Sequence, residues 1–352
     1  MSGEYKKPST GQDQDGVRLH LNENGAGCSP RVLAVLRALT ARDAAVYPDY
    51  DLAQHAVASA FNVTTDHVLL TNGLDEGILA AAAAAFRDRT RPGVPEAVGV
   101  APAFDMYEVC THALGGALIT VPLGPDFEYR WDAIRDAVTG NTRIVFVTNP
   151  HNPTGHTLSL DDLQQLARDV SPAWLFVDEA YADFTGETLI EARLLGDLPN
   201  LLVGRTFAKS YGLAGLRAGA MFANPDTLQP LRHVVPPYSL NAYATAALPV
   251  ALADREYCAW YVDQARESRA LLTDACGRLG LQTWPSAANF MLVRVGPRAA
   301  SIVQELAARD IFVRDRSADP GCEGCIRMTT GVVNDTRRLV AALEEVWCGA
   351  AR

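Results

Sequence analysis

The sequence predicts an α/β protein with a three-layer, doubly wound, mostly parallel sheet and a smaller α+β domain. Strand-like and helix-like patterns alternate from residue 68 to residue 222, as is typical of parallel strands joined by helices. After Pro236-Pro-Tyr238 the pattern changes to long helical periodicity and then short strands. The length of 352 residues allows one large and one smaller domain. We expect an N-terminal arm over 1–40 that packs with the small domain, a large domain over 41–240 and a small C-terminal domain over 241–352.

The predicted elements follow in chain order. Ser29 and Pro30 indicate a helix start, with serine as the cap and proline in the first turn. Residues 68–71 form a strand that leads into a helix over 73–88, whose alanine run has high helix propensity. Further strands are predicted at 97–101, 117–121, 143–147, 173–178, 200–205 and 216–222. The C-terminal part shows helical periodicity over 241–279, short strands at 289–295, 311–314 and 325–329, and a final amphipathic helix at 333–347.

Composition and charge exclude several classes of partner. The net charge of −10 argues against nucleic acid or an anionic membrane, since both repel an acidic surface. No apolar stretch approaches the length of a membrane span, and the first residues lack the apolar core of a signal peptide. The seven cysteines are scattered, which fits a reducing compartment. We expect a cytoplasmic protein.

A metal site is not expected. The only close cysteine pair, Cys322 and Cys325, has no second pair and no histidines nearby. Ordinary thiols are therefore favoured over a zinc or redox role. The seven histidines also lack metal-ligand spacing.

Two strand ends carry the chemistry. The apolar strand 173–178 delivers Asp178 and then Tyr181, and the strand that follows leads to Lys209. A carboxylate, a phenol and a lysine at successive strand ends suit a pyridine cofactor whose aldehyde forms a Schiff base with the lysine. This combination predicts pyridoxal 5′-phosphate.

The predicted roles follow from that cofactor. Asp178 beneath the pyridine nitrogen would keep it protonated, so that the ring accepts electrons, and Tyr181 would hydrogen-bond the phenolate oxygen. Lys209, made less basic by its surroundings, would form the Schiff base and then act as base and acid. The alternatives are a helix-capping aspartate and a solvated surface lysine.

Asn152 lies in Asn149-Pro-His-Asn-Pro-Thr-Gly155, directly after the strand 143–147. Two Asn-Pro steps force extended and turn geometry, so the strand stops with a side-chain amide at its tip. Asn152 could donate a hydrogen bond to the phenolic oxygen of a pyridoxal ring, although turn formation alone would explain the prolines and the glycine.

A phosphate site is predicted where the strand 68–71 meets the next helix. The turn at Gly73, Leu74 and Asp75 places free N–H groups and the positive end of the helix together. Thr206 and Arg217 are the expected side-chain ligands of the phosphate. The simpler alternative is a strand-to-helix turn with acids that favour the helix start.

Together, these segments resemble the fold-type I pyridoxal-phosphate enzymes, specifically class I/II aminotransferases of the histidinol-phosphate aminotransferase type. The matching segments occur in family order over nearly the whole chain after residue 18: LNEN at 21–24, YPD at 47–49, NGLDEG at 72–77, APAFDMY at 101–107, NPHNPTG at 149–155, VDEAY at 177–181, RTFAKSYGLAGLRAG at 205–219, ANF at 288–290 and CIRMTTG at 325–331.

The resemblance implies further roles. Phe104 would stack on the cofactor ring, and Tyr47 would reach the partner subunit's phosphate, which makes a homodimer the expected unit. Arg327 would bind the substrate's α-carboxylate. The segment from Asn22 through Asn24 to Gly25 would close over the substrate. Arg314 either contacts the substrate's carboxylate or distal group, or is a surface charge at a strand end.

The resemblance implies transfer of an amino group between an amino acid, or a histidinol-phosphate-like amine, and a 2-oxo acid. Ala208 stands where the family usually has serine, Gly25 where proline is common, and the arm lacks a Thr-Pro-Tyr element. These departures concern the substrate more than the cofactor. The alternatives are a decarboxylase of the threonine-phosphate type, a non-catalytic module, and a nicotinamide-dependent dehydrogenase, whose G-x-G-x-x-G turn does not occur.

Overall fold

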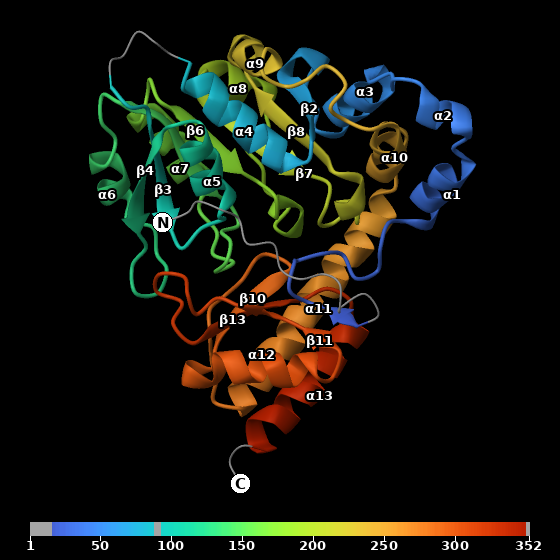
Figure 1. Cartoon of the computed structure of the whole chain (residues 1–352), viewed down its shortest axis with the longest axis vertical. Coiled ribbons are helices and arrows are strands. Elements are labelled where there is room, and N and C mark those ends of the chain that lie inside the picture. The colour runs from blue at the N-terminus through green and yellow to red at the C-terminus, as the bar shows by residue number, and fades with distance from the viewer. Residues whose placement is uncertain (1–15, 88–92, 350–352) are drawn as a thin grey trace.

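The large sheet has seven strands in the order β2-β8-β7-β6-β5-β3-β4 in a computed structural model, which describes residues 16–87 and 93–349 (Figure 1). Only β8 runs antiparallel to its neighbours, so the prediction of a mostly parallel sheet is confirmed. The strands are β2 (Val68–Asn72), β3 (Glu96–Ala101), β4 (Ala117–Pro122), β5 (Thr142–Thr148), β6 (Trp174–Asp178), β7 (Leu201–Thr206) and β8 (Ala218–Ala223).

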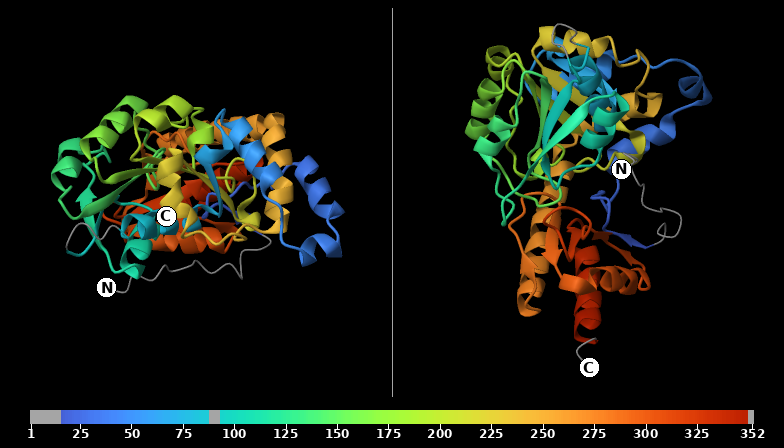
Figure 2. Two further views of the ribbon diagram at one scale, coloured as in Figure 1. Left: turned by 90° about the horizontal axis from the view of Figure 1, so that it is seen from above. Right: turned by 60° about the vertical axis from the view of Figure 1, so that its left-hand side comes forward.

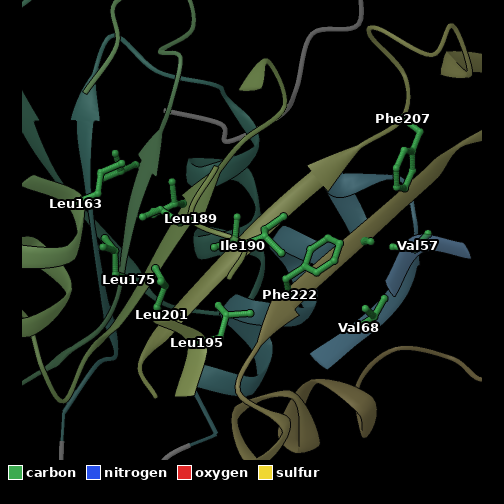
Figure 3. Packing of buried hydrophobic residues seen from close by; sticks show 14 of the residues in the cluster. Val57, Val68, Leu163, Leu175, Leu189, Ile190, Leu195, Leu201, Phe207 and Phe222 are labelled. Atoms are coloured by element: carbon green, nitrogen blue, oxygen red, sulfur yellow. The ribbon is translucent and has the colours of Figure 1, made fainter. Parts of the chain in front are cut away.

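Helices cover both faces of this sheet and give the predicted three layers. One face carries α4 (Leu74–Ala85), α5 (Met106–Ala113) and α9 (Pro225–Arg232). The other face carries α1 (Pro30–Ala38), α3 (Asp51–Ala60), α6 (Trp131–Asp136), α7 (Leu160–Asp169), α8 (Ala192–Asp197) and α10 (Ala242–Ala253). A short helix, α2 (Ala41–Ala45), lies between α1 and α3. Figure 3 shows the second face, where Leu175 and Leu201 of adjacent strands and Phe222 of β8 belong to one buried hydrophobic cluster.

Strand periodicity decides which side chains reach the functional face. In β5, Val145 and Val147 belong to the buried cluster that includes α6 and α7, whereas Ile144 and Phe146 belong to the cluster that includes α4 and α5. The central strands are buried on both faces, which explains their nearly continuous apolar sequences. Because side chains alternate along a strand, the polar residues at even positions at the ends of β5, β6 and β7 lie on the α4–α5 face.

The C-terminal part forms a second unit below the large sheet, and the long helix α11 (Arg255–Arg278) runs from one to the other (Figures 1 and 2). Its antiparallel sheet has the order β12-β13-β10-β9. The bounds are β9 (Gln282–Thr283), β10 (Phe290–Arg294), β12 (Arg314–Asp315) and β13 (Cys325–Thr329), with α12 (Ala299–Ala307) and α13 (Val333–Gly349) packed against them.

The N-terminal segment joins this second unit. β1 (Val17–Arg18) pairs in parallel with β11 (Ile311–Phe312), and Val17 and Leu19 are buried in the C-terminal hydrophobic core. Residues 1–15 lie outside the described residues. The domain boundaries at residues 40 and 240 remain predictions.

Element boundaries show where sequence patterns were incomplete. The oxygen of Ser29 accepts a hydrogen bond from the Val32 amide, so the predicted serine cap of α1 is confirmed. The helical stretch 241–279 is divided into α10 and α11, because the chain turns at Asp254. The last predicted large-sheet strand begins at Ala218, since residues 214–216 form a short 3-10 helix.

The carboxyl ends of β5, β6 and β7 meet at one edge of the sheet. They end at Thr148, Asp178 and Thr206, and Thr148 is directly paired with Asp178 in the sheet register. Ligands of open α/β sheets bind at this edge, where loops from several strands converge. The fold therefore brings the predicted reactive groups to one place.

Candidate active site

A cavity of about 630 Å³ opens at the carboxyl ends of β5, β6 and β7. Most of the predicted site residues line it: Leu74, Asp75, Phe104, Asn152, Asp178, Tyr181, Thr206, Lys209, Arg217, Arg314 and Arg327. Four predicted residues do not. Gly73 lies behind Arg217, Asn24 and Gly25 line an adjacent cavity of about 480 Å³, and Tyr47 is on the surface.

Asp178 is held at both carboxylate oxygens. Its Oδ1 accepts a hydrogen bond from the Ala180 amide at 2.9 Å, and its Oδ2 accepts one from the Tyr107 hydroxyl at 2.7 Å. Only 3% of the residue is exposed. Burial raises the pKa of Asp178 to about 6, and the two donors oppose that rise. The carboxylate is thus buried and aimed into the cavity, as its proposed role requires.

Lys209 follows β7 and points into the same cavity. Its Nζ donates to the main-chain oxygen of Leu21 at 3.0 Å and lies 5.8 Å from the centre of the Tyr181 ring. Burial, and then the nearby Arg327 guanidinium, lower the pKa of Lys209 to about 8. A substantial fraction of this amine is therefore neutral near pH 8, as a nucleophile and proton carrier needs.

The N-terminal segment closes one side of the cavity. The Asn22 side chain donates to the Tyr181 hydroxyl at 3.0 Å, and the His20 carbonyl accepts from Nη2 of Arg327 at 2.8 Å. Asn22 has a left-handed backbone conformation with φ of 56°. The turn at Asn22 lets main-chain and side-chain groups of this segment face the cavity together.

Asn152 and Arg327 touch each other across the cavity. Nη1 of Arg327 donates to the Asn152 side-chain oxygen at 2.6 Å. Arg327 is buried, it donates to the neutral oxygens of Asn152 and His20, and its Nε has no hydrogen-bond partner among the described residues. A buried guanidinium without a carboxylate partner favours binding of an anion.

More cations stand beside Arg327 on the small sheet. Arg314 lies directly opposite Arg327 in the strand register, and Arg316, two residues further on, also lines the cavity. Arg316 forms an ion pair with Asp319, and Arg18 across the cavity pairs with Glu23 at 3.0 Å. This wall suits a substrate that carries an acidic group.

The opposite end of the cavity has the donors of a phosphate site. Gly73 is the N-cap of α4, with φ of 76°, and has no side chain that could cap the helix. The amides of the first turn of α4 therefore stay available to an anion at this end of the cavity. A Cβ at this position would lie 2.5 Å from the Arg217 guanidinium, so only glycine lets Arg217 approach so closely. Arg217 also pairs with Asp75 at 2.8 Å. The Thr206 hydroxyl is in the same lining.

A buried ion network supports the lysine loop from behind. Arg205 points to the opposite face of the sheet from Thr206 and pairs with Glu179 at 3.3 Å and with Asp183. Asp183 also accepts a hydrogen bond from Ser210, the residue after Lys209. Glu179 is therefore part of a buried ion pair.

Sequence reasoning missed several residues of the site. Tyr107 and Thr148, which form a hydrogen-bonded chain to Asp178, were not predicted, nor were Arg18 and Arg316. Tyr107 lies three residues after Phe104, across the turn that leads into α5, where its amide donates to the Phe104 carbonyl. That spacing was the available signal for Tyr107.

Tyr47 lies outside the cavity of its own chain. It is 78% exposed, stacks on Tyr238 with ring centres 4.3 Å apart, and is near the exposed Val46 and Leu52 in sequence. Apolar side chains exposed together in this way favour an interface with another molecule.

Cys322 and Cys325 are free and buried, and no group of three or more metal-ligating residues occurs within 16–87 and 93–349. No helix in those ranges is long and apolar enough to cross a membrane.

The donor set fits pyridoxal 5′-phosphate. The cavity joins a partly neutral lysine, a buried carboxylate, an amide with a phenol, and a phosphate cradle whose close approach depends on Gly73. These are the four features that an aldehyde, a pyridine nitrogen, a ring oxygen and a phosphate ester require of a protein.

The family model "Aminotransferase class I and II" matches residues 14–343. The histidinol-phosphate aminotransferase of Oleidesulfovibrio alaskensis is 34% identical over 343 residues, which cover 95% of this chain and 88% of that protein. The crystal structure of histidinol-phosphate aminotransferase from Sinorhizobium meliloti in complex with pyridoxal 5′-phosphate has a TM-score of 0.82 at 28% identity, with 95% and 91% of the two chains covered.

A decarboxylase also shares the fold. The structure of L-threonine-O-3-phosphate decarboxylase from Porphyromonas gingivalis has a TM-score of 0.77 at 23% identity and covers 94% of this chain and 99% of that chain. Similarity at that level shows the fold alone.

Proposed function

The chain belongs to the class I and II aminotransferases, which use pyridoxal 5′-phosphate, and we propose that its substrates are an acidic amine donor and a 2-oxo acid. The donor is an amino acid or an amine like histidinol phosphate. The observation that carries this proposal is the cavity that Lys209, Asp178 and Arg327 share. When bound, the cofactor supplies an electron sink for the pair left as a bond to the substrate's α-carbon breaks.

Four groups hold the cofactor in this proposal. Thr206, Arg217 and the first turn of α4 bind the phosphate, with Gly73, Leu74 and Asp75 forming that turn. Phe104, which lines the cavity and packs against Tyr107, would cover one face of the ring. Asn152 and Tyr181 donate to the ring oxygen. Asp178 keeps a proton on the ring nitrogen, because an ionised carboxylate in a buried site favours a cation beside it.

Lys209 moves the proton of the reaction. The other basic side chains that line the cavity are guanidinium groups, which stay charged and cannot accept a proton, so Lys209 is the base among them. With a pKa lowered to about 8, Nζ of Lys209 accepts the proton from the substrate's α-carbon and returns it later.

Arg327 orients the substrate. Its planar guanidinium binds the substrate's acid group through two hydrogen bonds, which displaces the contacts to Asn152 and His20. When the acid group is held fixed, the C–H bond of the α-carbon is the bond aligned for cleavage, so a proton is removed and carbon dioxide is not lost. Arg314 extends this cationic wall and binds a distal anionic group.

The N-terminal segment covers the substrate in this proposal. Asn24 donates to the Ser210 carbonyl at 3.1 Å, and Gly25 lies near Asp335 of α13. Contacts to both the lysine loop and the C-terminal unit suit a segment that closes when the substrate binds.

We also propose a homodimer in the cytoplasm. Tyr47 reaches the phosphate of the partner's cofactor, which accounts for its exposure in the single chain. Seven free cysteines fit a reducing compartment.

A single-turnover screen tests the substrate proposal. The cofactor-loaded protein is mixed with histidinol phosphate, aromatic amino acids, glutamate or phosphothreonine, and the absorbance of the cofactor is followed. Conversion by an acidic donor, reversed by a 2-oxo acid, is the expected result. Release of carbon dioxide without a need for an oxo acid would contradict amino transfer.

A further inference from the structure

Tyr107 of α5 is a buried phenol that the proposed reaction does not use. Its ring stacks on Phe146 of β5, with centres 4.8 Å apart and planes 8° apart, and meets Phe104 edge to face at 5.9 Å. The residue is 3% exposed. Because both sides of the ring are packed, the direction of its hydroxyl is fixed.

That hydroxyl links the ends of two neighbouring strands. It donates to Oδ2 of Asp178 at 2.7 Å and lies 2.7 Å from Oγ1 of Thr148. Tyr107 has one proton, so when it donates to Asp178 it accepts from the Thr148 hydroxyl. The result is a directed chain of hydrogen bonds from Thr148 through Tyr107 to Asp178.

These hydrogen bonds offset part of the cost of burying the Asp178 carboxylate. Burial raises the pKa of Asp178, whereas donation from Tyr107 and from the Ala180 amide lowers it. Three other ionisable groups face Asp178. Asp75 from α4 raises the pKa of Asp178, and Lys209 from the loop after β7 lowers it. The third group is Tyr181 from the loop after β6.

We propose that Tyr107 is a positioning residue for the reaction: its hydroxyl, supported by Thr148, keeps Asp178 ionised and directed at the ring nitrogen of the cofactor. This inference rests on the role proposed above for Asp178. Without the hydroxyl, Asp178 keeps one donor, the Ala180 amide, and its charged form is less favoured.

Infrared titration of the cofactor-free protein tests the inference directly. The band of the protonated Asp178 carboxyl is identified by its loss in Asp178→Asn. Tyr107→Phe retains the packed ring and should shift the midpoint of this band to higher pH by about one unit, since a hydrogen bond to a charged group contributes about 1.5 kcal/mol or more. In the loaded enzyme, the acid limb of kcat/KM should move in the same direction.

Tyr129→Phe is the matched control. Tyr129 is a buried tyrosine whose hydroxyl donates to the Thr148 carbonyl at 3.4 Å rather than to Asp178. Its loss should leave the midpoint unchanged. Thr148→Val should give a smaller shift in the direction of Tyr107→Phe, and it serves as the test if Tyr107→Phe does not fold.

An unchanged midpoint in Tyr107→Phe, or in Thr148→Val where the former does not fold, would overturn the inference. The infrared result needs neither cofactor nor turnover, so it is separate from the proposed function. A shift in a protein that transfers no amino group would leave the Tyr107 inference standing and reject the function.

Discussion

Nζ of Lys209 lies 3.0 Å from the main-chain oxygen of Leu21, although the two residues are 188 positions apart. The preceding carbonyl, of His20, accepts from Arg327. Two consecutive carbonyls of the N-terminal segment thus contact the lysine and the arginine of the site. This segment is a wall of the cavity, and its carbonyl oxygens hold the Lys209 amine and the Arg327 guanidinium in place.

The lowered pKa of Lys209 predicts how the apoprotein takes up its cofactor. Only the neutral amine attacks an aldehyde, so the second-order rate of pyridoxal phosphate capture should rise with pH and level off above about pH 8. Stopped-flow absorbance measures this rate. Arg327→Met removes a positive charge that lowers the pKa of Lys209, so it should move the midpoint to higher pH. A rate independent of pH would contradict the prediction.

Asp178→Asn should lower kcat of the loaded enzyme by about 100-fold or more, equivalent to about 3 kcal/mol of the barrier. An amide cannot stabilise a protonated ring nitrogen as a carboxylate does. Cofactor binding should persist, because the phosphate donors are untouched. Asp274→Asn, an exposed change in α11, is the control for the loss of one negative charge. Equal turnover in Asp178→Asn and wild type would exclude the proposed role.

The same variant should stabilise the cofactor-free protein at alkaline pH. The folded pKa of Asp178, about 6, exceeds its ordinary value of 3.8, so ionisation costs stability. This cost is absent below the unfolded pKa, grows as the pH rises and is complete above the folded pKa, where it amounts to about 3 kcal/mol. Urea unfolding at about pH 8 should show Asp178→Asn as the more stable protein, with a gap that closes toward about pH 4.

Much of this arrangement was predictable from sequence, because apolar strands and their terminal residues report local structure. Asp178, Lys209 and Asn152 follow strands whose ends meet at one sheet edge. Contacts between distant segments gave no such signal. The bond from Tyr107 to Asp178 spans 71 residues, and the ion pair of Arg205 with Glu179 joins adjacent strands on the opposite face. Asp254 ends one helix and starts another without proline or glycine.

Arg327→Gln should raise KM for the amino donor by about 100-fold, since two charge-assisted hydrogen bonds to the substrate's acid group are lost. Its effect on cofactor affinity should be small. Arg314→Gln, which changes the directly opposed residue, should weaken only donors with a distal phosphate or carboxylate. Steady-state kinetics with donors that have and lack a distal acid separate the two arginines. Equal losses for both donor types in Arg314→Gln would contradict its assignment.

The exposed residues around Tyr47 predict the oligomeric state. Leu52, on α3, is 78% exposed, as is Tyr47. Leu52→Asp places a charge on the proposed interface and should convert a dimer into monomers with weaker cofactor binding. Sedimentation velocity measures the change, and Val94→Asp, at an exposed apolar residue just before β3, should leave the dimer intact. A wild-type protein that sediments as a monomer would reject the interface.

The most direct test of the central claim uses the scarcity of lysine in this chain. The sequence contains lysine only at positions 6, 7 and 209, so borohydride reduction with bound pyridoxal phosphate has three possible lysine targets, and peptide mass spectrometry distinguishes them from one another and from the α-amine. We expect a stoichiometric adduct on the peptide that contains Lys209, and we expect Lys209→Ala to lose both this adduct and turnover. An adduct confined to Lys6 or Lys7, or undiminished turnover in Lys209→Ala, would contradict it.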